Sequence, residues 1–162
     1  MFQSRTAVFS AVAPPFGVCY HIFMSATSDL ERAVRRALED FPEIQFALLF
    51  GSAAAGRLRE DSDLDVAVYV DADGRLEVEE ERSLPNEADI QIAVEGATGR
   101  NVDLLLLNRA PATVCAAAVT KGKVVLLRDR ALYLRYYLAV TRVAEEFMET
   151  EREFREIRDR SR

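Results

Sequence analysis

Cysteine and histidine are scarce in this sequence of 162 residues, which contains two cysteines and one histidine. Cys19 and Cys115 lie far apart without CxxC spacing, and His21 is the single histidine. Zinc sites and disulfide-stapled folds need several such residues at close spacing. We therefore expect neither kind of site, and we expect a reduced, cytoplasmic protein.

Long apolar runs and excess positive charge are also missing. No run reaches the roughly 18 to 20 apolar residues that a membrane-spanning helix needs, and Pro14-Pro15 interrupts the mildly apolar start of the chain. The 21 basic and 27 acidic residues give a formal net charge of −6. We expect no membrane contact and no direct nucleic-acid binding, because binding to phosphate backbones requires positive surface charge.

The length suits one domain, and the apolar pattern predicts an α/β fold. Residues 1–25 are interpreted as a leader, disordered or loosely attached, and residues 26–130 as the catalytic domain. Short apolar runs predict strands, capping and proline signals predict helices, and the acidic segment 71–82 is interpreted as a solvated surface loop. The expected strands are 44–50, 64–70, 102–108 and 123–127, and the expected helices are 29–41, 86–99, 111–122 and 129–160.

The last of these helices is long, since residues 129–160 contain neither glycine nor proline. Its first half carries an apolar stripe that is expected to dock on the sheet. Its last third is nearly all charged, and two interpretations remain open: a solvated end, or a surface that contacts a partner. The stripe consists of Leu132, Tyr136, Ala139, Val140 and Val143.

A Gly-Ser pair follows the first expected strand. Gly51 allows the main chain to turn and to approach a ligand closely, and Ser52 begins an expected helical turn that runs to Gly56. Main-chain N–H groups at such a turn, together with the serine hydroxyl, are suited to bind phosphate oxygens. The pair is therefore a candidate phosphate-binding turn.

Three carboxylates stand at the starts of the next two apolar strands. Asp63 and Asp65 are two residues apart, which places their side chains on the same face of a strand. Adjacent carboxylates repel each other, so this pair favours binding of Mg²⁺ or Mn²⁺. Asp103 precedes a run of leucines, where packing does not explain a carboxylate. If the two strands are neighbours, three carboxylates can hold two metal ions.

Each motif alone has a simpler explanation. A Gly-Ser pair is often only a turn, an Asp-x-Asp pair is usually a surface pair, and an aspartate at a strand edge is usually a cap. The combination is more specific, because a Gly-Ser pair after a buried strand is followed by aspartates that enter two further apolar strands.

This arrangement resembles the nucleotidyltransferase superfamily that includes polymerase β. The resemblance is carried by Gly51-Ser52, by residues 62–65 (Ser-Asp-Leu-Asp) and by residues 102–104 (Val-Asp-Leu). The small size is similar to its minimal branch, whose members are often the antitoxin halves of toxin–antitoxin pairs. The similarity spans roughly residues 29–130, including the segment Leu-Leu-Asn-Arg-Ala-Pro at 106–111.

The resemblance implies a nucleotidyltransferase fold, a small mixed β-sheet flanked by helices, with ATP as substrate. It implies that Gly51, Ser52 and Ser62 bind the nucleotide, and that catalytic Asp63, Asp65 and Asp103 bind two Mg²⁺ or Mn²⁺ ions. Minimal members often carry an arginine just before the second glycine of the motif, whereas this chain has alanines at positions 53–55. Arg57 and Arg59 either supply that positive charge or are solvated loop residues.

The implied reaction is transfer of AMP from ATP to a hydroxyl, expected to be a tyrosine, of a helical HEPN-type toxin, within a hetero-oligomer. Two alternatives remain: an antitoxin that acts by binding alone, and nucleotidyl transfer to a small molecule such as an aminoglycoside. The second usually needs another domain to enclose the acceptor, and residues 131–162 leave little chain for one.

Overall fold

The computed structural model describes residues 28–57, 59, 62–70 and 75–160. The expected leader therefore lies outside the described residues. The described segments contain five helices and four strands. The helices are α1 (Asp29–Glu39), α2 (Gly51–Ala54), α3 (Glu87–Thr98), α4 (Ala112–Lys121) and α5 (Arg130–Arg160). The strands are β1 (Ile44–Leu49), β2 (Leu64–Val70), β3 (Val102–Leu106) and β4 (Lys123–Leu127). The expected helices and strands are confirmed, with ends that shift by a few residues.

The strands form one mixed sheet in the order β3-β2-β1-β4. β1 is antiparallel to both β2 and β4, and β2 is parallel to β3. Parallel strands need a crossover connection, and α3 provides it between β2 and β3. The small mixed sheet flanked by helices is confirmed.

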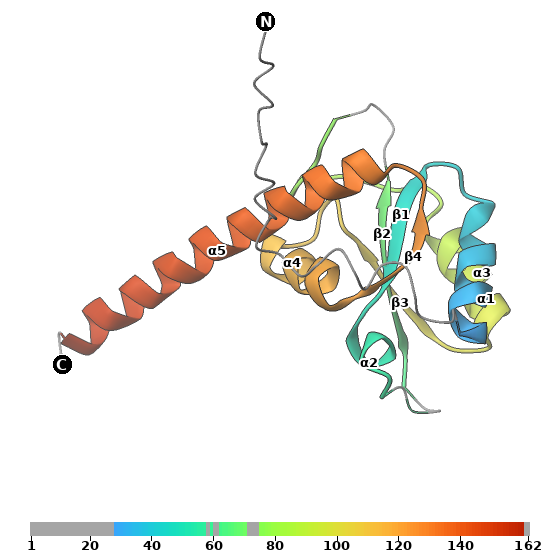
Figure 1. The fold of residues 1–162 in the computed structure, drawn as a ribbon, viewed down its shortest axis with the longest axis horizontal. Helices are drawn as coiled ribbons and strands as arrows, with labels where there is room; N and C mark the ends of the chain where they lie inside the picture. The colour runs from blue at the N-terminus through green and yellow to red at the C-terminus, as the bar shows by residue number, and fades with distance from the viewer. Residues whose placement is uncertain (1–27, 58, 60–61, 71–74, 161–162) are drawn as a thin grey trace, which may run out of the picture.

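Helices cover both faces of the sheet, as Figure 1 shows, with α1 and α3 on one face and α4 and α5 on the other. Side chains alternate between the faces along each strand, so Leu64, Val66 and Val68 pack in the first layer, and Ala67 and Tyr69 pack in the second. Both layers are well buried, which fixes the register because a shift by one residue would exchange the two faces.

Ser28 and Glu31 form a partial capping box at the start of α1. Oγ of Ser28 accepts a hydrogen bond from the main-chain N–H of Glu31 at 3.2 Å. The carboxylate of Glu31 accepts a hydrogen bond from the hydroxyl of Ser28 at 3.1 Å, where a full capping box would have it accept from the serine N–H. Val34 and Leu38 are the buried residues of this helix.

The first half of α5 docks on the second layer as expected. Leu132, Tyr136 and Val140 are fully buried, and the hydroxyl of Tyr136 donates to the carbonyl of Leu107 at 2.8 Å. The expectation for Val143 is wrong, since its side chain is 37% exposed and Ala144 is the buried residue at this level. From residue 145 onward every described residue is exposed, and Figure 1 shows this part of the helix projecting beyond the domain.

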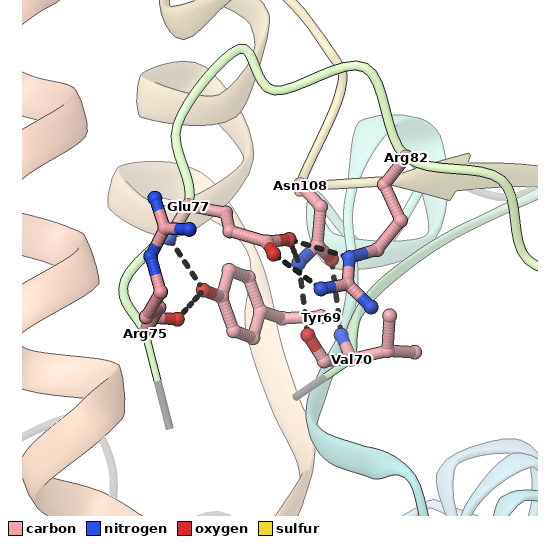
Figure 2. A network of polar contacts seen from close by, with 6 residues as sticks. All are labelled: Tyr69, Val70, Arg75, Glu77, Arg82 and Asn108. Carbon is pink, nitrogen blue, oxygen red and sulfur yellow. Dashed lines mark hydrogen bonds and ion pairs between the residues drawn. The ribbon is translucent and has the colours of Figure 1, made fainter. Parts of the chain in front are cut away.

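The expected solvated loop between β2 and α3 is partly wrong, because its described part, residues 75–82, folds back on the domain. Leu76 and Val78 pack against the second layer. The carboxylate of Glu77 lies between Arg82, whose Nε donates at 2.6 Å, and the amide of Asn108, which donates at 2.7 Å (Figure 2). Apolar residues at alternate positions within an acidic run explain this packing, since they can bury one side of the segment.

Asn108 fastens this loop to the sheet. Its side chain accepts from the N–H of Val70 at 3.1 Å and donates to the carbonyl of Val70 at 2.8 Å, as Figure 2 shows. Asn108 is the one polar residue among the buried side chains of the described segments, and all of its partners are internal. A buried amide that satisfies both main-chain groups of Val70 extends the pairing of β2 beyond the end of β3.

Candidate functional site

The site predicted from the sequence lies at one end of the strands, where β1 ends and β2 and β3 begin. Main-chain hydrogen bonds join these strand ends: the N–H of Phe50 donates to the carbonyl of Asp65 at 3.1 Å, and the N–H of Leu64 donates to the carbonyl of Asn101 at 2.8 Å. Figure 1 shows α2 at this end of the strands. The main chain alone therefore brings together residues that are about 50 positions apart in the sequence.

Asp65 and Asp103 are directly opposite each other in the parallel ladder of β2 and β3. Paired residues in a ladder point to the same face of the sheet, so the two carboxylates share a face. Asp65 is half-buried and Asp103 is exposed. The condition set by the sequence, that the strand of Asp103 lies beside the strand of Asp65, is met.

Gly51 lies against the carboxylate of Asp65. Its φ of +59° is in the left-handed region, which disfavours residues with a side chain. A Cβ atom at this position would lie 2.9 Å from Cγ of Asp65 and closer still to Oδ2. Glycine is therefore required twice, once for the turn that starts α2 and once to leave room for Asp65.

Ser52 contributes to the same contact, because its main-chain N–H forms a hydrogen bond with Asp65 that lowers the pKa of this carboxyl. This N–H group thus orients the carboxylate and is occupied by it. A phosphate at this turn would therefore bind to the serine hydroxyl and to the neighbouring main-chain amides.

The pKa of Asp65 is nevertheless raised above its ordinary value of 3.8. Burial of the carboxyl is the main cause, and the negative charge of Asp103 is the second, with a smaller contribution from Asp63. Burial and adjacent like charges both disfavour the ionised form. The negative charge of Asp63 thus acts on the carboxyl of Asp65, although the side chain of Asp63 is exposed. A positive ion at this place would offset all three causes.

The donor chemistry suits a divalent metal, since hard cations prefer carboxylate oxygens. In the described segments, however, no group of three or more histidine, cysteine, aspartate or glutamate side chains is arranged so that it could hold one ion. Asp65 and Asp103 are paired across β2 and β3, and Asp63 lies two residues before Asp65 in the chain. The side chains therefore form no complete set of ligands in this conformation.

The segment before β2 carries the remaining predicted residues. Ser62 is half-buried, and its N–H donates to the carbonyl of Arg59 at 3.3 Å. Arg57 and Arg59 are exposed and form no ion pair with any described residue. The sequence interpretation missed Arg100, whose guanidinium donates to the carbonyl of Arg59 at 2.8 Å and so ties this segment to the start of β3. Its position three residues before Asp103 was the available signal.

An open groove of about 590 Å³ runs along β3, the edge strand of the sheet. It is lined by Leu104, Leu105 and Leu106 on the strand, and by the glutamates at 79–81 on the folded-back loop. None of the six predicted site residues lines it, although Leu104 adjoins Asp103. The groove is thus next to the site but does not coincide with it.

A mixed sheet that places a Gly-Ser turn and two carboxylates in register at one end of its strands defines the class of α/β nucleotidyltransferase domains. The family model described as polymerase beta, nucleotidyltransferase, matches residues 32–131, and the chain belongs to this family. Among curated proteins, none matches this chain.

Several solved structures share the fold. A toxin–antitoxin complex with AMP-PNP has a chain that is 22% identical, with a TM-score of 0.63, covering 78% of this chain and 95% of that chain. A complex of tri-AMPylated HEPN toxin from Shewanella oneidensis with MNT antitoxin gives 20% identity and a TM-score of 0.58, covering 78% and 93%. The toxin–antitoxin MntA–HepT gives 20% identity and a TM-score of 0.58, covering 78% and 94%. At these identities the likeness shows the nucleotidyltransferase fold.

None of the helices in the described part of the chain combines the length and the apolar character needed to cross a membrane.

Proposed function

We propose that this protein transfers AMP from ATP to a hydroxyl of a partner toxin and thereby acts as an antitoxin. The observation that carries the proposal is the pairing of Asp65 with Asp103 across β2 and β3, with Gly51 packed against Asp65. Family membership supports nucleotidyl transfer. The structural neighbours that contain AMP-PNP or an AMPylated HEPN toxin support ATP as the donor and a toxin as the acceptor.

The roles follow from position. Gly51, Ser52 and Ser62 would bind the triphosphate at the turn that leads into α2. Asp63 and Asp65 would hold two Mg²⁺ or Mn²⁺ ions, and Asp103 would share one of them. When bound, the ions neutralise triphosphate charge and lower the pKa of the attacking hydroxyl. The raised pKa of Asp65 supports this assignment, because a cation favours the ionised form that burial disfavours.

The chain's residues would orient an in-line displacement. The hydroxyl oxygen of the acceptor forms a bond to the α-phosphorus, and the bond between the α-phosphorus and the oxygen that bridges to the β-phosphate breaks. Pyrophosphate leaves, and the exposed carboxylate of Asp103 accepts the hydroxyl proton. Positioning and charge neutralisation carry this reaction, so no histidine or cysteine nucleophile is needed.

The proposed acceptor is a tyrosine hydroxyl of a helical HEPN-type toxin, in a hetero-oligomer with this chain. The formal net charge of −6 favours encounter with a basic protein. An added AMP places a negative phosphate on the toxin, which would repel RNA phosphates if the modified residue lies near the toxin's own active site.

The test uses a HEPN-type toxin sought among the genes next to that of this protein, and it measures the intact mass of the purified toxin after incubation with this protein, ATP and Mg²⁺. We expect one or more additions of AMP, which disappear with Asp103→Ala. The control variant Asp89→Ala removes an exposed aspartate in the first turn of α3 that is not one of the predicted site residues. It should leave the additions of AMP unchanged. An unchanged toxin mass with the wild-type protein contradicts the proposal.

Binding alone is the second candidate, favoured by the finding that no described set of three ligands could hold a metal ion. It predicts that Asp103→Ala still neutralises the toxin in cells. The enzyme proposal predicts that this variant fails to neutralise it. An aminoglycoside incubated in place of the toxin, with mass as the readout, tests the small-molecule alternative in the same assay.

A further inference from the structure

The outer half of α5 carries large apolar side chains in water. Phe147, Met148 and Phe154 are 55%, 57% and 68% exposed. All residues from 145 to 160 are exposed, so the half of the helix from 145 to 156 projects from the domain with its side chains in solvent. Helical stability in proteins comes mainly from packing of an apolar face, which makes an isolated, projecting helix of this kind unusual.

The apolar residues follow a heptad pattern that begins in the docked half. From Tyr136 and Val140, which are buried against the domain, the spacing of four and three residues continues along the same face of the helix. We call its exposed continuation the outer stripe; its members are Val143, Phe147, Thr150, Phe154 and Ile157. The stripe spans about 21 Å at 1.5 Å per residue. The apolar face of α5 that packs on the domain in the first half of the helix therefore continues in the second half, which projects beyond the domain.

The charges beside the outer stripe are mainly negative. Glu146, Glu151 and Glu153 flank it in the positions that contact a partner helix in a coiled coil. Residues 143–157 contain six glutamates and two arginines, a net charge of −4. The pairs of Glu146 with Arg142 and of Glu151 with Arg155 are exposed pairs within one helix, which are weak and can exchange partners.

We infer that the outer stripe binds an amphipathic helix of the partner toxin whose apolar face is flanked by lysine or arginine. A second copy of this chain fits less well, because overlapping the two stripes in either direction would bring together two segments that each carry −4. A basic helix would satisfy both the apolar face and the glutamates. This inference rests on the proposed function for the identity of the partner, and it adds the surface by which that partner is held.

The apolar part of the inference is tested with full-length protein and purified toxin by titration calorimetry. Phe147→Ala with Phe154→Ala should weaken binding at least tenfold. The matched control, Leu138→Ala with Met148→Ala, removes two equally exposed apolar side chains that lie off the stripe, and it should bind as the wild type does. Alanine favours helix, so circular dichroism should show the same helix content in all forms.

The charge part has its own matched pair. Glu146→Lys with Glu153→Lys reverses two flanking charges, and Glu145→Lys with Glu149→Lys makes the same change in net charge on other sides of the helix. We expect the first pair to weaken binding several-fold more than the second, with the difference shrinking at high salt. Equal effects would show attraction by net charge alone and would overturn the assignment of the flanks.

Three results would overturn the inference: toxin binding that is unchanged in the stripe variant, a wild-type dimer in sedimentation that the stripe variant converts to a monomer, and tighter toxin binding after deletion of residues 1–23. The last two would show that a second copy or the chain's own start covers the stripe. Toxin that binds through the stripe without gaining AMP would leave the inference standing and contradict the proposed function. Asp103→Ala should bind the toxin normally.

Discussion

Oδ2 of Asp65 fills the space that a side chain at residue 51 would need, so Gly51 and Asp65 fit together only because residue 51 is glycine. The left-handed φ of Gly51 adds a second reason. Gly56, five residues further on, has a similar φ of +66° but open space around its Cβ position. A comparison of substitutions at the two glycines therefore separates the free-energy cost of the left-handed backbone from the cost of contact with Asp65.

Replacing Gly56 by alanine should lower the free energy of unfolding by about 1 to 2 kcal/mol, the cost of a side chain in the left-handed region. Gly51→Ala should cost clearly more, because Asp65 must also move. Gly51→Ala should also abolish triphosphate binding, whereas Gly56→Ala should retain it. Urea unfolding and calorimetry with a nonhydrolysable triphosphate measure both effects, and equal costs for the two variants would contradict the role of Asp65.

Asp63→Asn with Asp65→Asn should abolish nucleotidyl transfer while the fold is retained. Removing two negative charges relieves repulsion around Asp103, so metal-free thermal stability should stay the same or rise. Calorimetry with Mg²⁺ and a nonhydrolysable triphosphate should show no binding. Asp40→Asn with Asp89→Asn makes the same charge change on exposed residues and serves as the control. Unchanged binding in the first double variant would exclude both residues as ligands.

Glu77 should make folding stability depend on pH. Hydrogen bonds from Arg82, and also from Asn108, hold the pKa of this carboxyl below its ordinary value of 4.5. A lowered pKa in the folded state gives stability that is present above pH 4.5 and is lost as the pH falls through the folded-state pKa. Glu77→Gln should therefore cost about 2 kcal/mol at pH 7, from the loss of charged hydrogen bonds, and less as the pH falls below 4.5.

The control for Glu77 is Glu81→Gln, which changes an exposed carboxylate that forms no ion pair with any described residue. Urea midpoints at pH 7 and below pH 4.5 give the comparison. A cost for Glu77→Gln that is the same at both pH values would show that the carboxylate charge does not matter.

Asn108→Leu should destabilise the protein by about 2 to 4 kcal/mol, because it leaves the N–H and the carbonyl of Val70 buried without partners. It should also release the segment at 75–82, which hydrogen exchange of the Glu77 amide would detect. Asn101→Leu makes the same substitution at an exposed asparagine, and it should lower the free energy of unfolding only slightly. Small and equal effects of the two variants would mean that Asn108 does not hold the loop.

The helices and strands were predictable because their signals are local. Ser28 and Glu31 mark the start of α1, and an apolar run marks each strand. The packing of residues 75–82 was missed because a run of glutamates dominated the interpretation, although Leu76 and Val78 alternate with charged residues within it. The burial of Ala144 in place of Val143 depends on where α5 leaves the domain, which the heptad spacing alone does not determine.

The sequence names the candidate residues of the site but does not give their geometry. The spacing of Asp63 and Asp65 needs only the period of a strand, whereas the register that places Asp65 opposite Asp103 depends on the order and direction of β2 and β3. The contact of Gly51 with Asp65 and the anchoring role of Arg100 join residues that are distant in the sequence. The sequence places Arg100 three residues before Asp103, but it does not show that Arg100 contacts the segment before β2 or that Gly51 contacts Asp65.

The main-chain bonds that join the ends of β1, β2 and β3 have an evolutionary consequence. The bonds from Phe50 to Asp65 and from Leu64 to Asn101 use N–H and carbonyl groups, so they do not depend on which side chains stand at positions 63, 65 and 103. A lineage can therefore lose its chemistry through a single substitution and still inherit an intact scaffold. Descendants that bind without catalysing, and catalytic sites that are later restored by reversion, are both accessible from this architecture without passing through an unfolded ancestor.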